Sequence, residues 1–216
     1  MSHFSALFVV LPAVGFGVTA YVTTVAMRRP SGNIDPALGK AMRDRRLVFL
    51  QQAALPAILG FVLWFLTLRL DSSVGPAVDA LALGFGLASL GTTVAPSLFY
   101  AARLPGLWKA PQGFGRVLTV AVLPETNVLF AFVIGDLLIG RLRDPTSSVA
   151  YLVGTSTAVA NTLALYAGVA LLQGYVARIT EGPVDVWFRS SVLRLAAVEV
   201  LPVLLLVWQF LLLPSV

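Results

Sequence analysis

The feature that most constrains this chain is a set of long segments that contain no charged side chain. Four segments of 22 to 33 residues lack Asp, Glu, Lys and Arg: 4–27, 47–68, 80–102 and 145–177. A helix needs about 20 apolar residues to cross the hydrocarbon core of a bilayer. Of the 216 residues, 58% are hydrophobic and 12% are charged. That charged share is about half of what a soluble domain carries. The sequence therefore predicts an integral membrane protein.

Two further apolar segments carry a few charges. Residues 114–140 contain Glu125 and Asp136, and residues 188–213 contain Arg194 and Glu199. Together with the four uncharged segments they predict an all-α protein with six transmembrane helices. No Lys or Arg precedes the first span, so we expect this span to be retained and not cleaved as a signal peptide.

The basic residues predict the orientation of the spans. Eleven of the fifteen Lys and Arg residues lie in the connections after spans one, three and five: Arg28, Arg29, Lys40, Arg43, Arg45, Arg46, Arg103, Lys109, Arg116, Arg178 and Arg189. The positive-inside rule places these connections in the cytoplasm and both termini on the outer side of the membrane. We expect this membrane to be the cell membrane. The chain is therefore predicted to form three antiparallel hairpins, comprising residues 1–71, 72–144 and 145–216.

The second helices of the three hairpins resemble one another. A Phe stands eleven positions before a Glu in two of them, as Phe114 with Glu125 and as Phe188 with Glu199. In the first hairpin, Ala57 follows a Leu-Pro pair as Glu125 does. Similar units at a regular interval indicate internal duplication.

The two repeated glutamates are predicted to lie deep in the bilayer. Eleven helical residues span about 16 Å, which is half of a hydrocarbon core of about 30 Å. A charged carboxylate at that depth costs at least several kcal/mol. One interpretation is structural, with Glu125 and Glu199 protonated or paired with Arg194 or Arg116. The other is functional, with the carboxylates binding and releasing a cation.

The composition excludes several kinds of chemistry. The chain has no Cys, and its one His, His3, stands near the N-terminus, so we expect no thiolate or histidine site and no cofactor. The basic residues alternate with apolar spans and do not form one patch, so we expect no nucleic-acid partner. The sequence has no Gly-rich phosphate loop ending in Lys-Ser or Lys-Thr. We therefore expect no ATP hydrolysis by this chain itself.

Three short motifs resemble one family of membrane proteins. The run Leu123-Pro124-Glu125-Thr126-Asn127, with its apolar continuation to Ile134, resembles the ion-binding helix of the rotor-ring proteolipid, subunit K or c, of V-type and A-type rotary ATPases. Pro111-Gln112-Gly113-Phe114-Gly115 is similar to that family's cytoplasmic loop, and Gln173-Gly174-Tyr175-Val176-Ala177 is similar to an inner helix. The resemblance covers most of residues 75–213 and is weaker before residue 70.

The resemblance implies a set of ion-binding residues. Glu199 corresponds to the essential carboxylate, and Gln173 to the amide that completes a sodium site. Thr126 and Asn127 correspond to polar ligands from the preceding hairpin, together with the carbonyl of Leu123. Glu125 matches the carboxylate position of its own hairpin, and Ala57 leaves the first hairpin without a carboxylate.

The resemblance also implies a function and partners. It predicts a homo-oligomeric membrane ring that carries H⁺ or Na⁺ past a stator subunit bearing a membrane Arg. Central-stalk subunits are expected at the cytoplasmic loops. The chain would be a non-catalytic ion-translocating subunit of the ATPase. The alternative is a stand-alone six-helix cation carrier or channel, and a third possibility is a membrane scaffold.

Overall fold

The computed structural model describes residues 4–28, 35–144, 148–179 and 184–213. All regular structure in these residues is helical, and no strand occurs in them. Six helical segments are long and apolar enough to cross a membrane. The structure therefore confirms the predicted all-α class and indicates a multi-pass membrane protein. The first boundary of the predicted units falls between α2 and α3, whereas the boundary at residue 145 lies outside the described residues.

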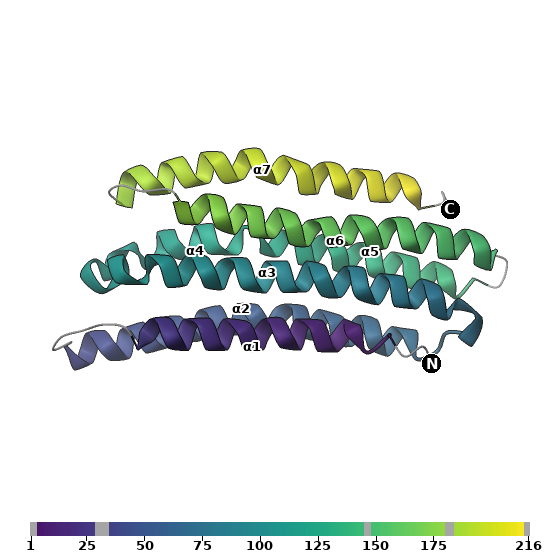
Figure 1. Ribbon diagram of the computed structural model, residues 1–216, viewed down its shortest axis with the longest axis horizontal. Helices are drawn as coiled ribbons and strands as arrows, with labels where there is room; N and C mark the ends of the chain where they lie inside the picture. Colours follow the sequence, from purple (N-terminus) through teal and green to yellow (C-terminus); the bar gives the residue numbers. More distant parts are fainter. Residues whose placement is uncertain (1–3, 29–34, 145–147, 180–183, 214–216) are drawn as a thin grey trace.

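The helices lie side by side along the long axis of the molecule (Figure 1). The two N-terminal helices are α1 (Leu7–Met27) and α2 (Pro36–Thr67), and α3 (Gly75–Lys109) follows a short 3₁₀ turn at Ser72–Val74. After a second 3₁₀ turn at Pro111–Gly113, the chain continues as α4 (Phe114–Val122), α5 (Glu125–Leu142), α6 (Val149–Ile179) and α7 (Val184–Leu212). Successive spans cross the molecule in opposite directions, with α4 and α5 together forming one span.

Helix α3 forms the centre of the molecule, and it contacts α6 more extensively than any other pair of helices does. Small residues permit this close approach. A Cβ atom added to Gly84 would lie 2.8 Å from the Cα atom of Ala160, and one added to Gly91 would lie 2.5 Å from that of Ala167. Helices in lipid gain little from the hydrophobic effect, so their association depends on such close backbone packing.

The opposite face of α3 packs against α1. A Cβ atom on Gly15 of α1 would overlap the side chain of Thr93 on α3. The Thr19 hydroxyl of α1 donates a hydrogen bond of 3.1 Å to the carbonyl of Thr93. The three helices α1, α3 and α6 thus lie in a row with α3 in the middle.

The fourth span is broken near its middle. Helix α4 ends at Val122 and α5 begins at Glu125, with Leu123 and Pro124 between them. Proline has no N–H to continue the helical ladder, so it frees a carbonyl one turn earlier. The break places the carbonyl of Leu123 beside the first turn of α5, where it accepts hydrogen bonds from both the backbone N–H and the hydroxyl of Thr126. Pro56 and Pro202, by contrast, lie inside unbroken helices.

Arginine side chains form hydrogen bonds between helices at the end of the molecule where α1 ends and α2 begins. Arg45 donates a hydrogen bond of 2.8 Å to the carbonyl of Pro111, and Arg103 donates one of 2.7 Å to that of Ala177. The Arg103 guanidinium also lies 4.7 Å from the centre of the Trp187 ring. These arginines therefore link helices that are distant in sequence.

The packing of α3 against α6 yields a prediction. Replacing Gly91 with Ala should lower the thermal unfolding temperature of the detergent-solubilised protein, because the new methyl group meets the α6 backbone. Overpacking of this kind typically costs about 1–3 kcal/mol. Gly168→Ala is the matched control, since no atom lies within 4 Å of a Cβ at Gly168. An unchanged or raised unfolding temperature for Gly91→Ala would contradict the close contact.

Candidate functional site

The strongest candidate site surrounds the carboxylate of Glu199. Glu199 is half-buried near the middle of α7. Its side chain meets Thr126 from the first turn of α5 and Gln173 from α6. Three spans therefore contribute to one cluster, and two of its members are separated by 73 residues of sequence.

Both oxygens of this carboxylate are within hydrogen-bonding reach of the cluster. The Thr126 hydroxyl lies 2.5 Å from Oε1 of Glu199, and Nε2 of Gln173 donates to Oε2. Neither Arg194 nor Arg116 contacts Glu199, although the sequence left such an ion pair open as the structural interpretation. Among the residues that the structure describes, the partners of Glu199 are thus uncharged. The carboxyl group can therefore change its charge without breaking an ion pair.

A buried amide extends the cluster. Asn127 and Gln173 are both fully buried. Nδ2 of Asn127 donates to Oε1 of Gln173 at 3.4 Å, and Oδ1 of Asn127 has no hydrogen-bond partner in the described part of the chain. A buried polar atom without a partner is costly in lipid and calls for an explanation. It provides one more oxygen next to the carboxylate cluster.

Glu125 lies outside this cluster. It is half-buried at the start of α5, and its carboxylate forms no hydrogen bond with any residue that the structure describes. The predicted repeat of the hairpins is compatible with this difference. The residues 68 positions before Thr126 and Asn127 are Ile58 and Leu59, which offer no polar atoms. The arrangement around Glu199 therefore has no counterpart around Glu125.

The sequence analysis did not identify a second buried polar pair. The Tyr166 hydroxyl of α6 donates a hydrogen bond of 2.7 Å to Oε1 of Gln209 on α7, and both residues are fully buried. Nε2 of Gln209 has no partner among the described residues. In the sequence, this pair was indicated only by Gln209, a polar residue within the apolar run of the last span. Such a residue is equally compatible with lipid exposure near a helix end.

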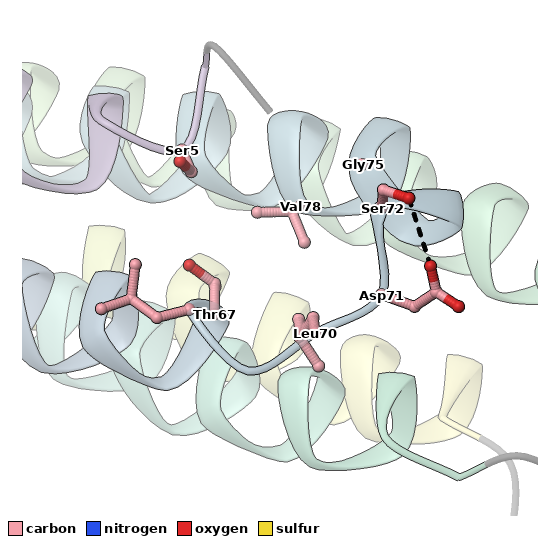
Figure 2. Close-up of a pocket in the computed structure, with 8 residues that line it drawn as sticks. Ser5, Thr67, Leu70, Asp71, Ser72, Gly75 and Val78 are labelled. Carbon is pink, nitrogen blue, oxygen red and sulfur yellow. Dashed lines mark hydrogen bonds between the residues drawn. The ribbon is translucent and has the colours of Figure 1, made fainter. Parts of the chain in front are cut away.

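A small pocket lies at the end of the molecule where α2 ends and α3 begins, and it is a weaker candidate for a functional site (Figure 2). Ser5, Thr67, Asp71 and Ser72 contribute polar groups to a cavity of about 40 Å³. The backbone N–H of Ser73, followed by the Ser72 side chain, holds the pKa of Asp71 below its usual range. Because Asp71 already caps the 3₁₀ turn, its carboxylate has a local structural role.

Neither metal-ligand groupings nor comparisons with known families indicate a function for this site. Within the described residues, no three His, Cys, Asp or Glu side chains are grouped so as to hold a metal ion. No protein-family profile matches the chain, and no curated protein sequence matches it significantly. The geometry of the cluster around Glu199, which we call the Glu199 site (Glu199, Thr126, Asn127 and Gln173), is therefore the basis for a functional proposal.

The amide in this site yields a second prediction. Gln173→Leu should destabilise the detergent-solubilised protein by about 1–3 kcal/mol, because it removes the donor to Oε2 of Glu199 and the acceptor for the buried amide of Asn127. Gln51→Leu is the control, because Gln51 is exposed on α2 and forms no hydrogen bond with a described residue. Thermal unfolding of both variants measures the difference. Equal unfolding temperatures would show that the hydrogen bond from Gln173 contributes nothing.

Proposed function

We propose that this chain is a rotor-ring subunit of a V-type or A-type rotary ATPase and carries a cation on Glu199. The observation that supports this proposal is the Glu199 site, in which α5, α6 and α7 surround one carboxylate with uncharged polar groups. An ion carrier needs a group that both binds and releases its ion within the membrane. A carboxylate near the middle of its helix, with polar neighbours and no counter-charge among the described residues, meets that need.

Hydrogen-bond geometry favours H⁺ as the carried ion. The oxygen of Thr126 lies within reach of two acceptors, the Leu123 carbonyl at 2.9 Å and Oε1 of Glu199 at 2.5 Å. A hydroxyl has one hydrogen and cannot donate to both acceptors. A protonated Glu199 resolves this conflict, because its O–H donates to Thr126 while Thr126 donates to Leu123. The oxygens of Glu199, Thr126 and Leu123 that take part in these hydrogen bonds then each have a partner.

The same site contains oxygen ligands of the kind that Na⁺ prefers. A carboxylate, a hydroxyl, a backbone carbonyl and the unpartnered Oδ1 of Asn127 are all hard oxygen donors. Such ligands favour an alkali cation over a transition metal. Na⁺ is therefore the second candidate ion, and competition between the two ions can be measured.

The arrangement of the helices is compatible with a ring. Helix α1 pairs with α2, α3 with α4 and α5, and α6 with α7, which supports three hairpins placed side by side. In the described residues, α3 contacts both α1 and α6 extensively, whereas α1 and α6 make no extensive contact with each other. A row of hairpins has two different edges. Joining one edge to the other edge of the next copy generates a closed ring when the rotation closes.

In this function the chain moves ions and leaves the chemistry of ATP to other subunits. Glu199 binds its ion from one half-channel of a stator subunit and releases it into the other, where an Arg on the stator displaces the ion. The cytoplasmic loops are the proposed contact for central-stalk subunits. Rotation of the ring then couples ion flow to ATP turnover in a peripheral sector.

The alternative function is a stand-alone six-helix cation carrier or channel. The buried pair of Tyr166 and Gln209 favours it, because these polar groups lie between Glu199 and the far end of α7 within one chain. The two functions differ in assembly, since a rotor subunit requires a ring of copies and a carrier works as a monomer or dimer. Native mass spectrometry of gently extracted protein distinguishes them.

Replacing the carboxylate tests the proposed function directly. Glu199→Gln is nearly isosteric and should reduce ATP-driven ion uptake into membrane vesicles by at least about tenfold, because an amide binds no proton. Glu125→Gln should retain most of the uptake, since Glu125 lacks hydrogen-bond partners in the described residues. Both variants should be present in the membrane at wild-type levels. Ion uptake that survives in Glu199→Gln would refute the proposed role of this residue.

Chemical labelling tests the identity of the ion. A hydrophobic carbodiimide reacts with a protonated carboxyl group, so its attachment to Glu199 can be followed by mass spectrometry of the intact protein. We expect the labelling rate to fall as pH rises and to be insensitive to millimolar Na⁺ at fixed pH. Slower labelling in Na⁺ would instead assign the site to Na⁺. Failure of Glu199 to react in intact membranes would contradict a protonatable site.

A further inference from the structure

A cavity of about 440 Å³ opens at the end of the molecule where α1 ends and α2 begins. Its charged lining residues are Arg28, Arg43, Arg46 and Asp35, and Trp108 from the end of α3 forms another part of the wall. A single water needs only about 10–15 Å³. The cavity is therefore large enough for a polar molecular group and not only for solvent.

The described residues do not balance the charges that line this cavity. The carboxylate of Asp35 caps α2 by accepting the N–H of Ala37 at 3.0 Å. Arg28 and Arg43 are exposed, and the guanidinium of neither has an ionic or hydrogen-bond partner among the residues that the structure describes. Three arginines thus face one carboxylate, and the cavity carries a net positive charge.

Arg46 provides a positioned donor on the wall of this cavity. It donates hydrogen bonds to the hydroxyls of Thr23 at 3.3 Å and Thr24 at 2.6 Å, which fix its guanidinium between α1 and α2. Its remaining N–H groups are not used by other described residues. Arginine presents several donors in one plane, a geometry that suits the oxygens of a phosphate group.

The position of this cavity along α2 indicates that it lies at the membrane surface. Helix α2 has 32 residues, which corresponds to about 48 Å, whereas the hydrocarbon core is about 30 Å thick. All charged residues of α2 lie between Lys40 and Arg46, and the uncharged residues 47–67 are long enough to cross the core. Arg43 and Arg46 therefore lie at the level of the lipid headgroups. Trp108 is a residue type that is enriched at that level.

We propose that this cavity binds the phosphate of an anionic phospholipid headgroup, held by Arg28, Arg43 and Arg46 beside the Trp108 indole. The phosphodiester would accept hydrogen bonds from the guanidinium donors that no described residue uses, and the acyl chains would extend along the apolar surface of α1 and α2. The proposal is independent of ion transport, because the cavity shares no residue with the Glu199 site.

Lipid titration followed by native mass spectrometry tests the assignment. The detergent-solubilised full chain is titrated with phosphatidylglycerol, with phosphatidylcholine, or with phosphatidylglycerol in the presence of millimolar inorganic phosphate. We expect phosphatidylglycerol to bind in preference to phosphatidylcholine, and inorganic phosphate not to displace it. The double variant Arg28→Gln, Arg43→Gln should weaken this binding about 25-fold, because each Arg near an anionic headgroup changes the binding constant about fivefold.

A charge-matched control separates the cavity from general electrostatics. Arg178 and Arg189 are exposed on α6 and α7 at the same end of the molecule and do not line the cavity. The double variant Arg178→Gln, Arg189→Gln should retain wild-type binding of phosphatidylglycerol. Equal loss in both double variants, unchanged binding in Arg28→Gln, Arg43→Gln, or equal binding of phosphatidylcholine would overturn the proposal. Displacement by inorganic phosphate would overturn the assignment to a lipid and assign the cavity to free phosphate.

Discussion

The close packing of α3 against α6 determines where the other functional groups lie. Gly84 and Gly91 bring the two backbones together, and Gly174 of α6 lies so close to Ala95 that an added Cβ would be 3.0 Å from its Cα atom. Gln173 immediately precedes Gly174, so the same contact sets its depth and orientation. Because Gln173 hydrogen bonds to both Asn127 and Glu199, the helix contact positions the whole Glu199 site. The small residues thus help to position the Glu199 site as well as to pack α3 against α6.

The lipid environment makes each buried polar group significant. Water is scarce in the bilayer core, so polar side chains must find partners within the protein. Around Glu199 they do so through a chain that runs from Leu123 through Thr126 to the carboxylate. The break at Pro124 places the carbonyl of Leu123 just before the first turn of α5, within reach of the Thr126 hydroxyl.

The composition of the sequence predicted the six spans, whereas the residues of the Glu199 site were implied only by the resemblance of short motifs to a known family. The repeat pattern alone could not separate the two glutamates. Adjacent residues on a helix point about 100° apart, so Glu125 and Thr126 cannot both face Glu199, and only the packing decides which one does. The pair of Tyr166 and Gln209 was missed for a similar reason. It joins two spans across 43 residues, and neither residue belongs to a repeated motif.

Under the proposed function, the difference between Glu125 and Glu199 affects whether the ring is better suited to pumping ions or to making ATP. The first predicted repeat has Ala57, and Glu125 lacks hydrogen-bond partners in the described residues, which leaves Glu199 as the supported carboxylate. A ring of such chains would carry one ion for every six helices. Fewer ions per turn lower the ratio of ions to ATP. At a fixed free energy of ATP hydrolysis, each ion can then be driven against a steeper gradient. A chain with one supported site in three repeats is therefore better suited to pumping ions than to making ATP.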